Sequence, residues 1–529
     1  MSYRYAASFV LEAHLPFVRE FNSEGDLTQA GKEGRFFEFV SQTLLPLLEV
    51  FGRLEKDSVP FRLALAVSPV LCQMLSDSHL IKKYLEYTDK QIEFSTQELN
   101  RTAGDDRLNR LAKITITKLL DRKIAFTERY EKDLIKAIDY YRRKEKIEIL
   151  GGCATNAFLP FLSHHPESLQ AQIETPLSVY RHHFGSTPQG FWLPDLGWTD
   201  TIEPYLRAYN FHYTIIDSHG LLFGKPLPEK GSFYPVKTPN GTFLLTRDFY
   251  AAKEIEKISA DELFLDNDRD IGYELSPELV SPFLGMEGER HKTGYKYWNR
   301  SGGKNAVYDP AAAAEKAAGY ALSFLNKTIS RLEEASGCMA ETPLCLYAGN
   351  ADNFGRFWHE GAHFIETLFR LAAARNDFQF VCPAEYIFKQ KLSSFQVVAP
   401  EFSSWGKNGY AETWLDTSND WIYRHLFRAM ERMTELAELF PDDTGLKERA
   451  LNQAARELLL TQSSDWPALL SRQDSTEYAR TKAENALRNF TTIYEALGSN
   501  HISVEWLTKL ERRHNLFPNI NYRVFRKKK

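Results

Sequence analysis

The sequence predicts an α/β fold, in which a seven-stranded parallel (β/α) barrel carries a helical insertion and a C-terminal α-helical bundle. Short runs rich in β-branched and aromatic residues alternate with segments of helical periodicity, which is typical of a parallel sheet. Seven such runs lie within the first ~390 residues, and this number favours a closed or nearly closed barrel. Beyond residue 400 the hydrophobic pattern becomes purely helical.

The seven predicted strands end in polar side chains. The runs occupy residues 4–14, 61–69, 146–155, 190–195, 211–219, 344–352 and 378–386. In parallel barrels the chemistry takes place at the carboxyl ends of the strands. The candidate site residues are therefore those that close the runs: Glu12, His14, Asn156, Asp195, Asp217, His219, Asn350 and Asp352.

Two insertions interrupt the alternation in the barrel domain, which is predicted to span residues 1–400. A charged segment with helical spacing, from about residue 78 to 146, predicts a helical excursion between two strands. A loop-rich segment, from about 220 to 310, is long enough to form one wall of a cleft. Within it, Asn240-Gly241 predicts a tight hairpin turn.

The remaining residues, 401–529, predict a helical bundle packed against the barrel. Its first helix carries one apolar stripe, formed by Trp421, Leu426, Met430, Met433 and Leu436. Methionine at this spacing is typical of a core rather than of a cofactor site. At least two further helices follow, near residues 448–460 and 477–497.

Composition and cysteine content exclude several classes of protein. A net charge of −5 gives no general attraction to nucleic acid or to an anionic membrane. The chain has no secretory leader pattern and no run of about 18 apolar residues, so a cytoplasmic location is expected. Its five cysteines form no CxxC pair, and no residues have the spacing of metal ligands. We therefore expect no disulfide framework, no metal and no cofactor.

Seven motifs, taken in order, resemble those of one protein family. They are AHLPFVR (13–19), SPVL (68–71), AFLPFL (157–162), FGSTPQGFWLPD (184–195), FGRFWHEG (354–361), SSWG (403–406) and SSDWP (463–467). On these motifs the chain resembles glycoside hydrolase family 57 and, within it, the bacterial and archaeal 1,4-α-glucan branching enzymes. The resemblance runs almost from end to end. Each motif alone is weak, whereas the ordered set is specific.

The resemblance implies a retaining mechanism with two carboxyl groups: a Glu nucleophile in W-L-P-E and an Asp acid/base in D-A-E-L-F-G. Aligned on these motifs, the nucleophile position is Asp195 and the acid/base position is Asn350. An amide has no acidic proton to give. Aspartate also places its carboxylate about 1.5 Å further back than glutamate. Asp352 lies two residues beyond Asn350, on the same side of an extended strand, and is the candidate substitute acid/base.

Three further departures from the family pattern are predicted to fall in the same cleft. The family's H-x-H-x-P motif reads EAHLP at 12–16, with Glu12 in place of the first histidine. The family's T-H turn after the third strand reads Thr155-Asn156, and the loop before RDIGY is shortened to residues 258–273. Polar positions have changed while the scaffold motifs remain. This pattern favours a fold retained after its catalytic demand relaxed.

Several tryptophans match positions that line or flank the family's glucan cleft. Trp405, Trp414 and Trp466 resemble lining positions, whereas Trp192 and Trp358 flank the two catalytic motifs. Indole rings stack on sugar rings and donate hydrogen bonds to hydroxyl groups. Packing at a domain junction explains each of these residues equally well.

Two histidines and one aspartate carry the same ambiguity. His14 and His219 either contact sugar or hold structural hydrogen bonds at the barrel mouth. Asp465 either binds sugar hydroxyls or caps the helix that follows it.

The expected function is that of a branching-enzyme-like homologue which binds α-1,4-glucan or maltooligosaccharide and turns it over poorly or not at all. The alternative is an active retaining branching enzyme or α-glucan hydrolase that uses Asp195 with Asp352. A metal-dependent deacetylase on a similar barrel is not favoured, because the sequence lacks the required Asp and two His ligands.

Overall fold

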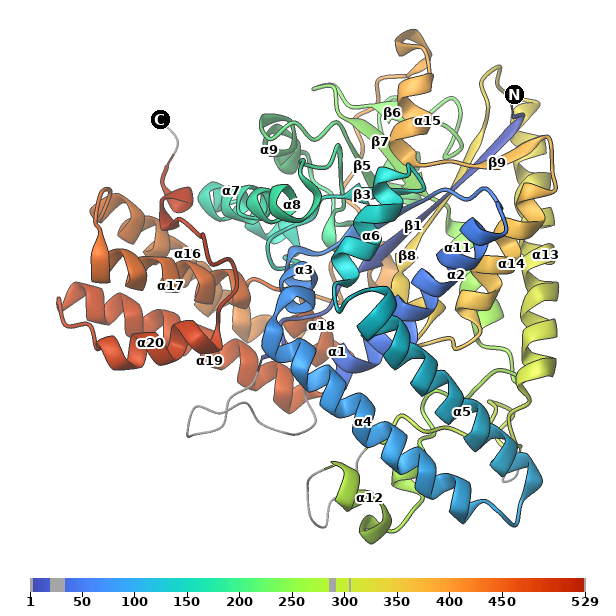
Figure 1. Cartoon of the computed structure of the whole chain (residues 1–529). Coiled ribbons are helices and arrows are strands. Elements are labelled where there is room, and N and C mark those ends of the chain that lie inside the picture. The colour runs from blue at the N-terminus through green and yellow to red at the C-terminus, as the bar shows by residue number, and fades with distance from the viewer. Residues whose placement is uncertain (1–2, 20–33, 285–291, 304–305, 528–529) are drawn as a thin grey trace.

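The computed structural model describes residues 3–19, 34–284, 292–303 and 306–527. Figure 1 shows a core of strands surrounded by helices, with the C-terminal helices gathered on one side of it. Parts of the predicted loop-rich insertion, 285–291 and 304–305, lie outside the described residues. Residues 1–2 of the predicted barrel domain and residues 528–529 of the predicted helical bundle also lie outside them.

One sheet contains five parallel strands. They are β1 (Tyr5–Ala13), β2 (Leu63–Val67), β3 (Ile147–Leu150), β8 (Leu344–Asn350) and β9 (Phe378–Phe380). Their order is β3-β2-β1-β8, and β9 pairs with the first residues of β1. Every residue of β1 is buried, as expected for a parallel strand with both faces covered.

A second sheet has the order β4-β5-β7-β6. Its strands are β4 (Gly190–Phe191), β5 (Tyr213–Asp217), β6 (Val236–Lys237) and β7 (Phe243–Arg247). The hairpin predicted at Asn240-Gly241 joins the antiparallel strands β6 and β7, with Gly241 at a φ of 102°. Beyond the hairpin, β7 pairs in parallel with β5 along its whole length, which the sequence pattern did not predict.

The two sheets meet at both of their facing edges. A parallel bridge joins Gly151, just after β3, to Phe191 of β4. At the other edge the main-chain N–H of Asp248 donates to the carbonyl of Leu346 in β8 at 2.7 Å. The parallel strands therefore follow one another around a common core, hydrogen-bonded as two sheets rather than as one continuous ring. The predicted α/β class with parallel strands is confirmed.

Alternate residues of the strands form an inner core. This core is a cluster of buried side chains that includes Ala6, Val10, Ala64, Ala66, Leu150, Tyr213, Ile215, Leu346 and Ala348. Successive side chains on a strand point to opposite faces, so residues with the same parity share a face. Glu12 therefore lies on the inner face of β1 with Val10, and Asn350 on the inner face of β8 with Ala348.

Helices cover the strands. They are α1 (Gly34–Phe39), α2 (Leu45–Lys56), α3 (Pro69–Ser76), α4 (Ser78–Arg101), α5 (Asp106–Ile124), α6 (Leu134–Arg143), α7 (Pro166–Glu174), α8 (Pro176–Phe184), α9 (Glu203–Ala208), α10 (Ser218–Leu222), α11 (Phe249–Ser259), α12 (Pro277–Leu284), α13 (Pro310–Ser336), α14 (Gly361–Ala373) and α15 (Pro383–Lys389). The predicted helical segment near 78–146 contains α4, α5 and α6. The side chains of Asp77 and Asp105 cap the first two of these helices by accepting main-chain N–H bonds.

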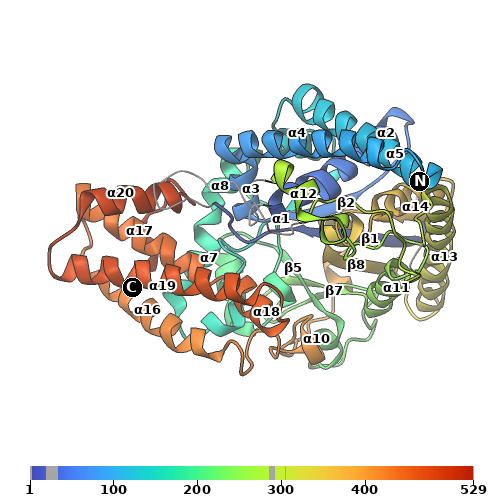
Figure 2. The same cartoon turned by 90° about the horizontal axis from the view of Figure 1, so that it is seen from below.

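The C-terminal region is helical, as predicted. Its helices are α16 (Asp420–Leu439), α17 (Gly445–Thr461), α18 (Asp465–Ser471), α19 (Thr476–Gly498) and α20 (Val504–Arg513). The predicted stripe on α16 buries Leu426, Met430, Met433 and Leu436, while Trp421 is partly buried. Figures 1 and 2 both show α18 at the end of this group that faces the strands. Among the described residues, no helix is long and apolar enough to cross a membrane.

Candidate active site

A cavity of about 410 Å³ opens at the carboxyl ends of the parallel strands. Its wall combines residues that end or follow β1, β3, β4, β7 and β8 with residues of segments 405–414 and 464–474 from beyond the barrel. Nine residues singled out from the sequence line it: Glu12, His14, Asn156, Asp195, Asn350, Asp352, Trp405, Trp414 and Asp465. The remaining candidates, Asp217, His219, Trp192, Trp358 and Trp466, lie outside the lining.

Asp195 lies just beyond β4, in the short 3-10 turn Pro194–Leu196. Its φ of 57° is a left-handed conformation, which is uncommon for a residue other than glycine and often marks a functional position. Ser464 Oγ donates to Oδ2 at 2.7 Å, and the Trp405 indole donates to Oδ1 at 3.1 Å. Burial raises the pKa of the Asp195 carboxyl to about 6, against the opposing effect of these two bonds.

Asn350 ends β8, and its side chain is exposed to the cavity. The register of β1 against β8 pairs it directly with Glu12. The amide can donate and accept hydrogen bonds, but it cannot transfer a proton near neutral pH. The cavity therefore has a neutral polar group at this end of β8.

Glu12 brings a carboxyl group to the same region from the neighbouring strand. It is 6% exposed, and the Trp192 indole donates to its Oε1 at 2.8 Å. Burial raises the pKa of Glu12 to about 8, and the negative charges of Asp195 and Asp465 add to this effect. His14 and the Trp192 bond oppose it. At neutral pH Glu12 is accordingly a protonated acid.

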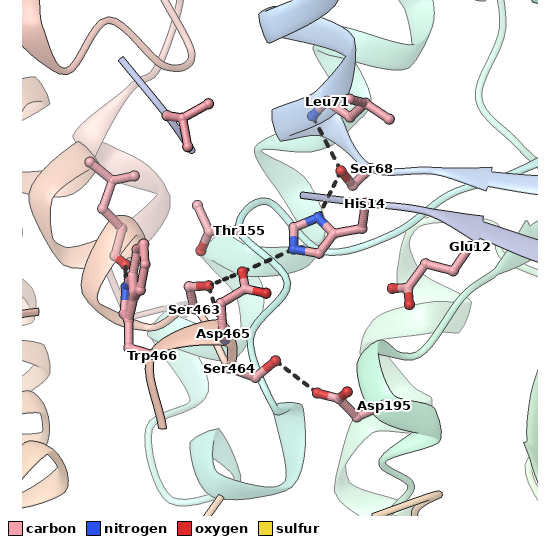
Figure 3. A network of polar contacts seen from close by, with 12 residues as sticks. Glu12, His14, Ser68, Leu71, Thr155, Asp195, Ser463, Ser464, Asp465 and Trp466 are labelled. Carbon is pink, nitrogen blue, oxygen red and sulfur yellow. Dashed lines mark hydrogen bonds and ion pairs between the residues drawn. The ribbon is translucent and has the colours of Figure 1, made fainter. Parts of the chain in front are cut away.

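A polar network links the barrel to the C-terminal region (Figure 3). Nε2 of His14 lies 2.9 Å from Asp465 Oδ2, and Nδ1 lies 2.9 Å from Oγ of Ser68, the N-cap of α3. Ser463 Oγ donates to the same Asp465 oxygen at 2.6 Å. Burial lowers the pKa of His14, but the Asp465 carboxylate, together with the carboxyl groups of Glu12 and Asp195, outweighs burial and raises the pKa above its usual value. The reciprocal effect of His14 holds the pKa of Asp465 below its usual range against burial.

Asp352 lines the cavity, but other residues bind its carboxylate. Thr43 Oγ1 donates to Oδ1 at 2.7 Å, and Arg356 Nε donates to Oδ2 at 3.0 Å. The Asp352 side chain is 7% exposed. Both of its oxygens are thus committed to structural partners.

Asn156 connects the third predicted strand to the C-terminal region. It has a φ of 57°, and its carbonyl accepts the main-chain N–H of Ser464 at 3.0 Å. The next residue, Ala157, forms an antiparallel bridge with Ser463. The turn at Asn156 thereby positions the serine that bonds Asp195.

The two cavity tryptophans differ in exposure. Trp405 is half-buried, and its ring lies edge-on to Trp192 with centroids 5.6 Å apart. Trp414 is 1% exposed and stacks on Phe158 at 4.5 Å. Trp405 thus presents more of its indole to the cavity than Trp414 does.

The structure does not bring Trp358, Trp466 or His219 into the cavity. Trp358 is fully buried and packs against Phe264, Phe354 and Phe364. Trp466 is also buried and donates to the carbonyl of Leu460.

His219 holds a loop in place instead. Its Nε2 lies 2.7 Å from the carbonyl of Gly409, and its Nδ1 lies 3.4 Å from Asp217. Asp217 is in turn paired with Arg247 at 3.0 Å.

Sequence reasoning missed two residues that shape the cavity. Ser464 lies inside the quoted SSDWP motif, but only the fold shows that its hydroxyl reaches Asp195. Arg247 ends β7, whose role as a core strand was not predicted, and its guanidinium lies 5.6 Å from the Trp405 ring centroid. Within the described residues, no three His, Cys, Asp or Glu side chains form a cluster able to hold a metal ion.

Comparison with known proteins agrees with the motifs. Residues 8–399 match the model for glycosyl hydrolase family 57, and residues 425–525 match the model for the 1,4-α-glucan branching enzyme C-terminal domain. The 1,4-α-glucan branching enzyme TK1436 of Thermococcus kodakarensis is 26% identical over 545 residues, covering 96% of this chain and 77% of that protein.

Solved structures share the whole architecture. The α-amylase AmyC of Thermotoga maritima has a TM-score of 0.91 and 31% identity, with 99% of this chain and 100% of that chain covered. The GH57-type branching enzyme of Pyrococcus horikoshii has a TM-score of 0.89 at 23% identity, with 99% and 97% covered, and shows the same fold. Because the family model spans well over half of its length, the chain belongs to glycosyl hydrolase family 57.

Proposed function

We propose that this chain binds α-1,4-glucan or maltooligosaccharide in the cavity beside Asp195, and that it is catalytically impaired as a branching enzyme. One observation carries the proposal. The cavity of a family 57 protein has Asn350 at the position where the resemblance implies the acid/base carboxyl. General acid catalysis typically supplies about 10²- to 10⁴-fold of rate, and an amide cannot provide it.

The cavity has the groups that a neutral sugar chain requires. Trp405 offers a partly exposed indole for stacking, and Asn156, Asn350 and Asp465 offer polar groups for hydroxyl contacts. The similar proteins named above are an α-amylase and 1,4-α-glucan branching enzymes, and a solved structure of TK1436 is described as a complex with glucose. We therefore propose α-glucans as the ligand class of this chain as well.

Asp195 weakens the nucleophile position. The aspartate side chain is one carbon–carbon bond shorter than that of glutamate, and a misplacement of the reacting group by about 1 Å can cost 10²-fold in rate. The bonds from Ser464 and Trp405 hold the carboxylate where it is. Both members of the expected dyad thus depart from the family pattern.

The alternative is an active enzyme that uses Asp352 as substitute acid/base. The ion pair with Arg356 and the bond from Thr43 count against this role. These contacts occupy both carboxylate oxygens of Asp352, so neither oxygen is free to approach a glycosidic oxygen. Asp352 is better explained as an anchor for the turn after β8.

Titration calorimetry with maltoheptaose tests the proposed binding. We expect a measurable affinity for maltoheptaose and none for a β-linked cellooligosaccharide of comparable length. Equal binding of both sugars, or of neither, would rule out an α-glucan site.

A further inference from the structure

We propose that Glu12 has taken over the proton-donating role of the position now occupied by Asn350, so that the glycosyl chemistry left in this protein runs through Glu12 and Asp195. The inference rests on the proposed binding of α-glucan in the cavity. It differs from the family pattern, in which the acid/base carboxyl belongs to β8, and from the alternative that uses Asp352.

Strand register places Glu12 beside Asn350. Glu12 on β1 is the direct partner of Asn350 on β8. Neighbouring strands lie about 4.8 Å apart, and paired residues project their side chains from the same face of a sheet. The carboxyl missing at Asn350 is therefore present one strand away, at the same height in the barrel.

The Glu12 side chain also points into the cavity. Glu12 shares the inner face of β1 with Ala6 and Val10, which belong to the inner core, and its side chain lines the cavity together with Asp195. Figure 3 shows the Glu12 and Asp195 carboxyl groups turned towards the same space, which Ser464 and Asp465 border from the other side. An acid and a nucleophile must flank the scissile bond in this way.

The carboxyl groups of Glu12 and Asp195 differ in their hydrogen bonds. Trp192 donates to Oε1 of Glu12, which fixes that oxygen as an acceptor. Within the residues that the structure describes, Trp192 is the hydrogen-bond partner of this carboxyl, so Oε2 is left to carry the proton. Asp195 instead accepts two hydrogen bonds, from Ser464 and Trp405, which favour its ionised form.

The charge states that follow match the two roles. Burial raises the pKa of Glu12 to about 8 and that of Asp195 to about 6. At neutral pH, Glu12 is mainly protonated and Asp195 mainly ionised. A pair of carboxyl groups whose environments separate their pKa values in this order has an acid and a nucleophile.

The reaction then has two balanced steps. In the first, an oxygen of Asp195 bonds to the anomeric carbon while the glycosidic C–O bond breaks. The electron pair of that bond goes to the leaving oxygen, which takes the proton from Glu12 Oε2. In the second, the oxygen of a water molecule bonds to the anomeric carbon while the ester C–O bond to Asp195 breaks. The electron pair of that bond returns to the Asp195 carboxylate, and the water gives a proton to the Glu12 carboxylate.

The test measures cleavage of maltoheptaose and of a nitrophenyl α-maltooligoside by the native protein and by Glu12→Gln. We expect slow native cleavage of maltoheptaose, and a further loss of about 10²-fold or more in Glu12→Gln. The rate of glycosyl-ester formation from the nitrophenyl substrate should stay within a few-fold of the native rate, because nitrophenolate leaves without protonation. A merely structural role for Glu12 would slow both substrates alike and overturn the proposal.

Two controls complete the test. Glu148→Gln alters a carboxyl group on β3 that is bonded to Tyr213 and lies outside the cavity lining. This variant should cleave both substrates at the native rate. Adding Asn350→Asp to Glu12→Gln should restore maltoheptaose cleavage, since it returns a carboxyl to the neighbouring strand.

A further measurement uses the native protein alone and does not depend on folding of a variant. The rate of glycosyl-ester formation across aryl α-maltooligosides should depend weakly on the acidity of the leaving phenol. A steep dependence, or native protein that does not cleave maltoheptaose, would refute proton donation by Glu12. Calorimetry separates this failure from failure of the proposed function, because glucan binding would persist in the first case and be absent in the second.

Discussion

Trp405 is joined to Asp195 twice: its indole N–H donates to Oδ1 at 3.1 Å, and its main-chain N–H donates to the Asp195 carbonyl at 3.0 Å. The Trp405 ring also lies edge-on to Trp192, whose indole N–H donates to Glu12. Two contacting indoles therefore hold the carboxyl groups of Glu12 and Asp195. Substitution of Trp405 is expected to affect both sugar recognition and the placement of Asp195, whereas substitution of Trp192, which lies outside the cavity lining, should affect the placement of Glu12.

Trp405→Ala should weaken the binding of maltoheptaose roughly tenfold, about 1.4 kcal/mol, because it removes the partly exposed ring available for stacking. Trp405→Phe keeps an aromatic face but loses the donor to Asp195, so its affinity should lie between those of Ala and Trp. Calorimetry measures all three proteins. Unchanged affinity in Trp405→Ala would show that the ring does not contact the sugar.

Trp414→Ala should act mainly on stability. Its side chain is 1% exposed and stacks on Phe158, and truncation of a buried tryptophan typically costs about 3–5 kcal/mol. Denaturant unfolding measures this loss. If the unfolding free energy is unchanged while maltoheptaose affinity falls, Trp414 is a sugar platform rather than a core residue.

Incubation of the protein with amylose should generate no detectable new α-1,6 branches. Branching needs an acceptor glucan to be positioned and its hydroxyl deprotonated, which places greater demands on the site than attack by water. The products are debranched and their chain lengths compared with those from boiled protein. A short-chain population above that control would show that branching activity survives.

The double variant Asn350→Asp with Asp195→Glu should increase glucan cleavage above that of the native protein, because it returns both family carboxyl groups. Recovery should be incomplete. The longer Glu side chain must re-form the bonds now made by Ser464 and Trp405, and Glu12 and Asn156 still differ from the family pattern. Asn350→Asp alone is the matched comparison, and reducing-end release is the measurement. A double variant no faster than the native protein would place the defect outside the dyad.

The sequence predicted the parallel α/β core well because each strand run is short, apolar and closed by a polar residue. It did not predict β7 as a core strand. Phe243–Arg247 directly follows a hairpin turn, so the local pattern indicates a hairpin alone. Its parallel pairing with β5 depends on residues far away in the sequence. The predicted strand at 378–386 is present in its first part as β9 (Phe378–Phe380), which among the described residues pairs with the start of β1 alone.

Motifs predicted which segments surround the cavity better than they predicted which side chains face it. Trp358 lies in a motif beside the acid/base position, yet the turn after β8 directs its ring into a cluster of phenylalanines. The pairing of Glu12 with Asn350 depends on the register of two strands more than 300 residues apart. No pattern within either segment encodes that register, so only the three-dimensional structure brings the two positions together.

Glu12→Gln should make the protein more stable than the native form at pH 9, with a much smaller difference at pH 5. The folded state raises the pKa of Glu12 to about 8, whereas an unfolded chain has a glutamate pKa near ~4.3. Folding therefore favours the protonated acid, and native stability falls as the pH rises between these values, by at most about 1.4 kcal/mol per pH unit. Glutamine has no proton to lose, so the Glu12→Gln variant does not lose stability through this group as the pH rises. The raised pKa of Asp195 still makes the stability of the variant depend on pH, but less strongly. Urea unfolding at both pH values measures the difference, with the exposed Glu262→Gln as control. An equal response of Glu12→Gln and native protein would mean that Glu12 is not held protonated in the folded state.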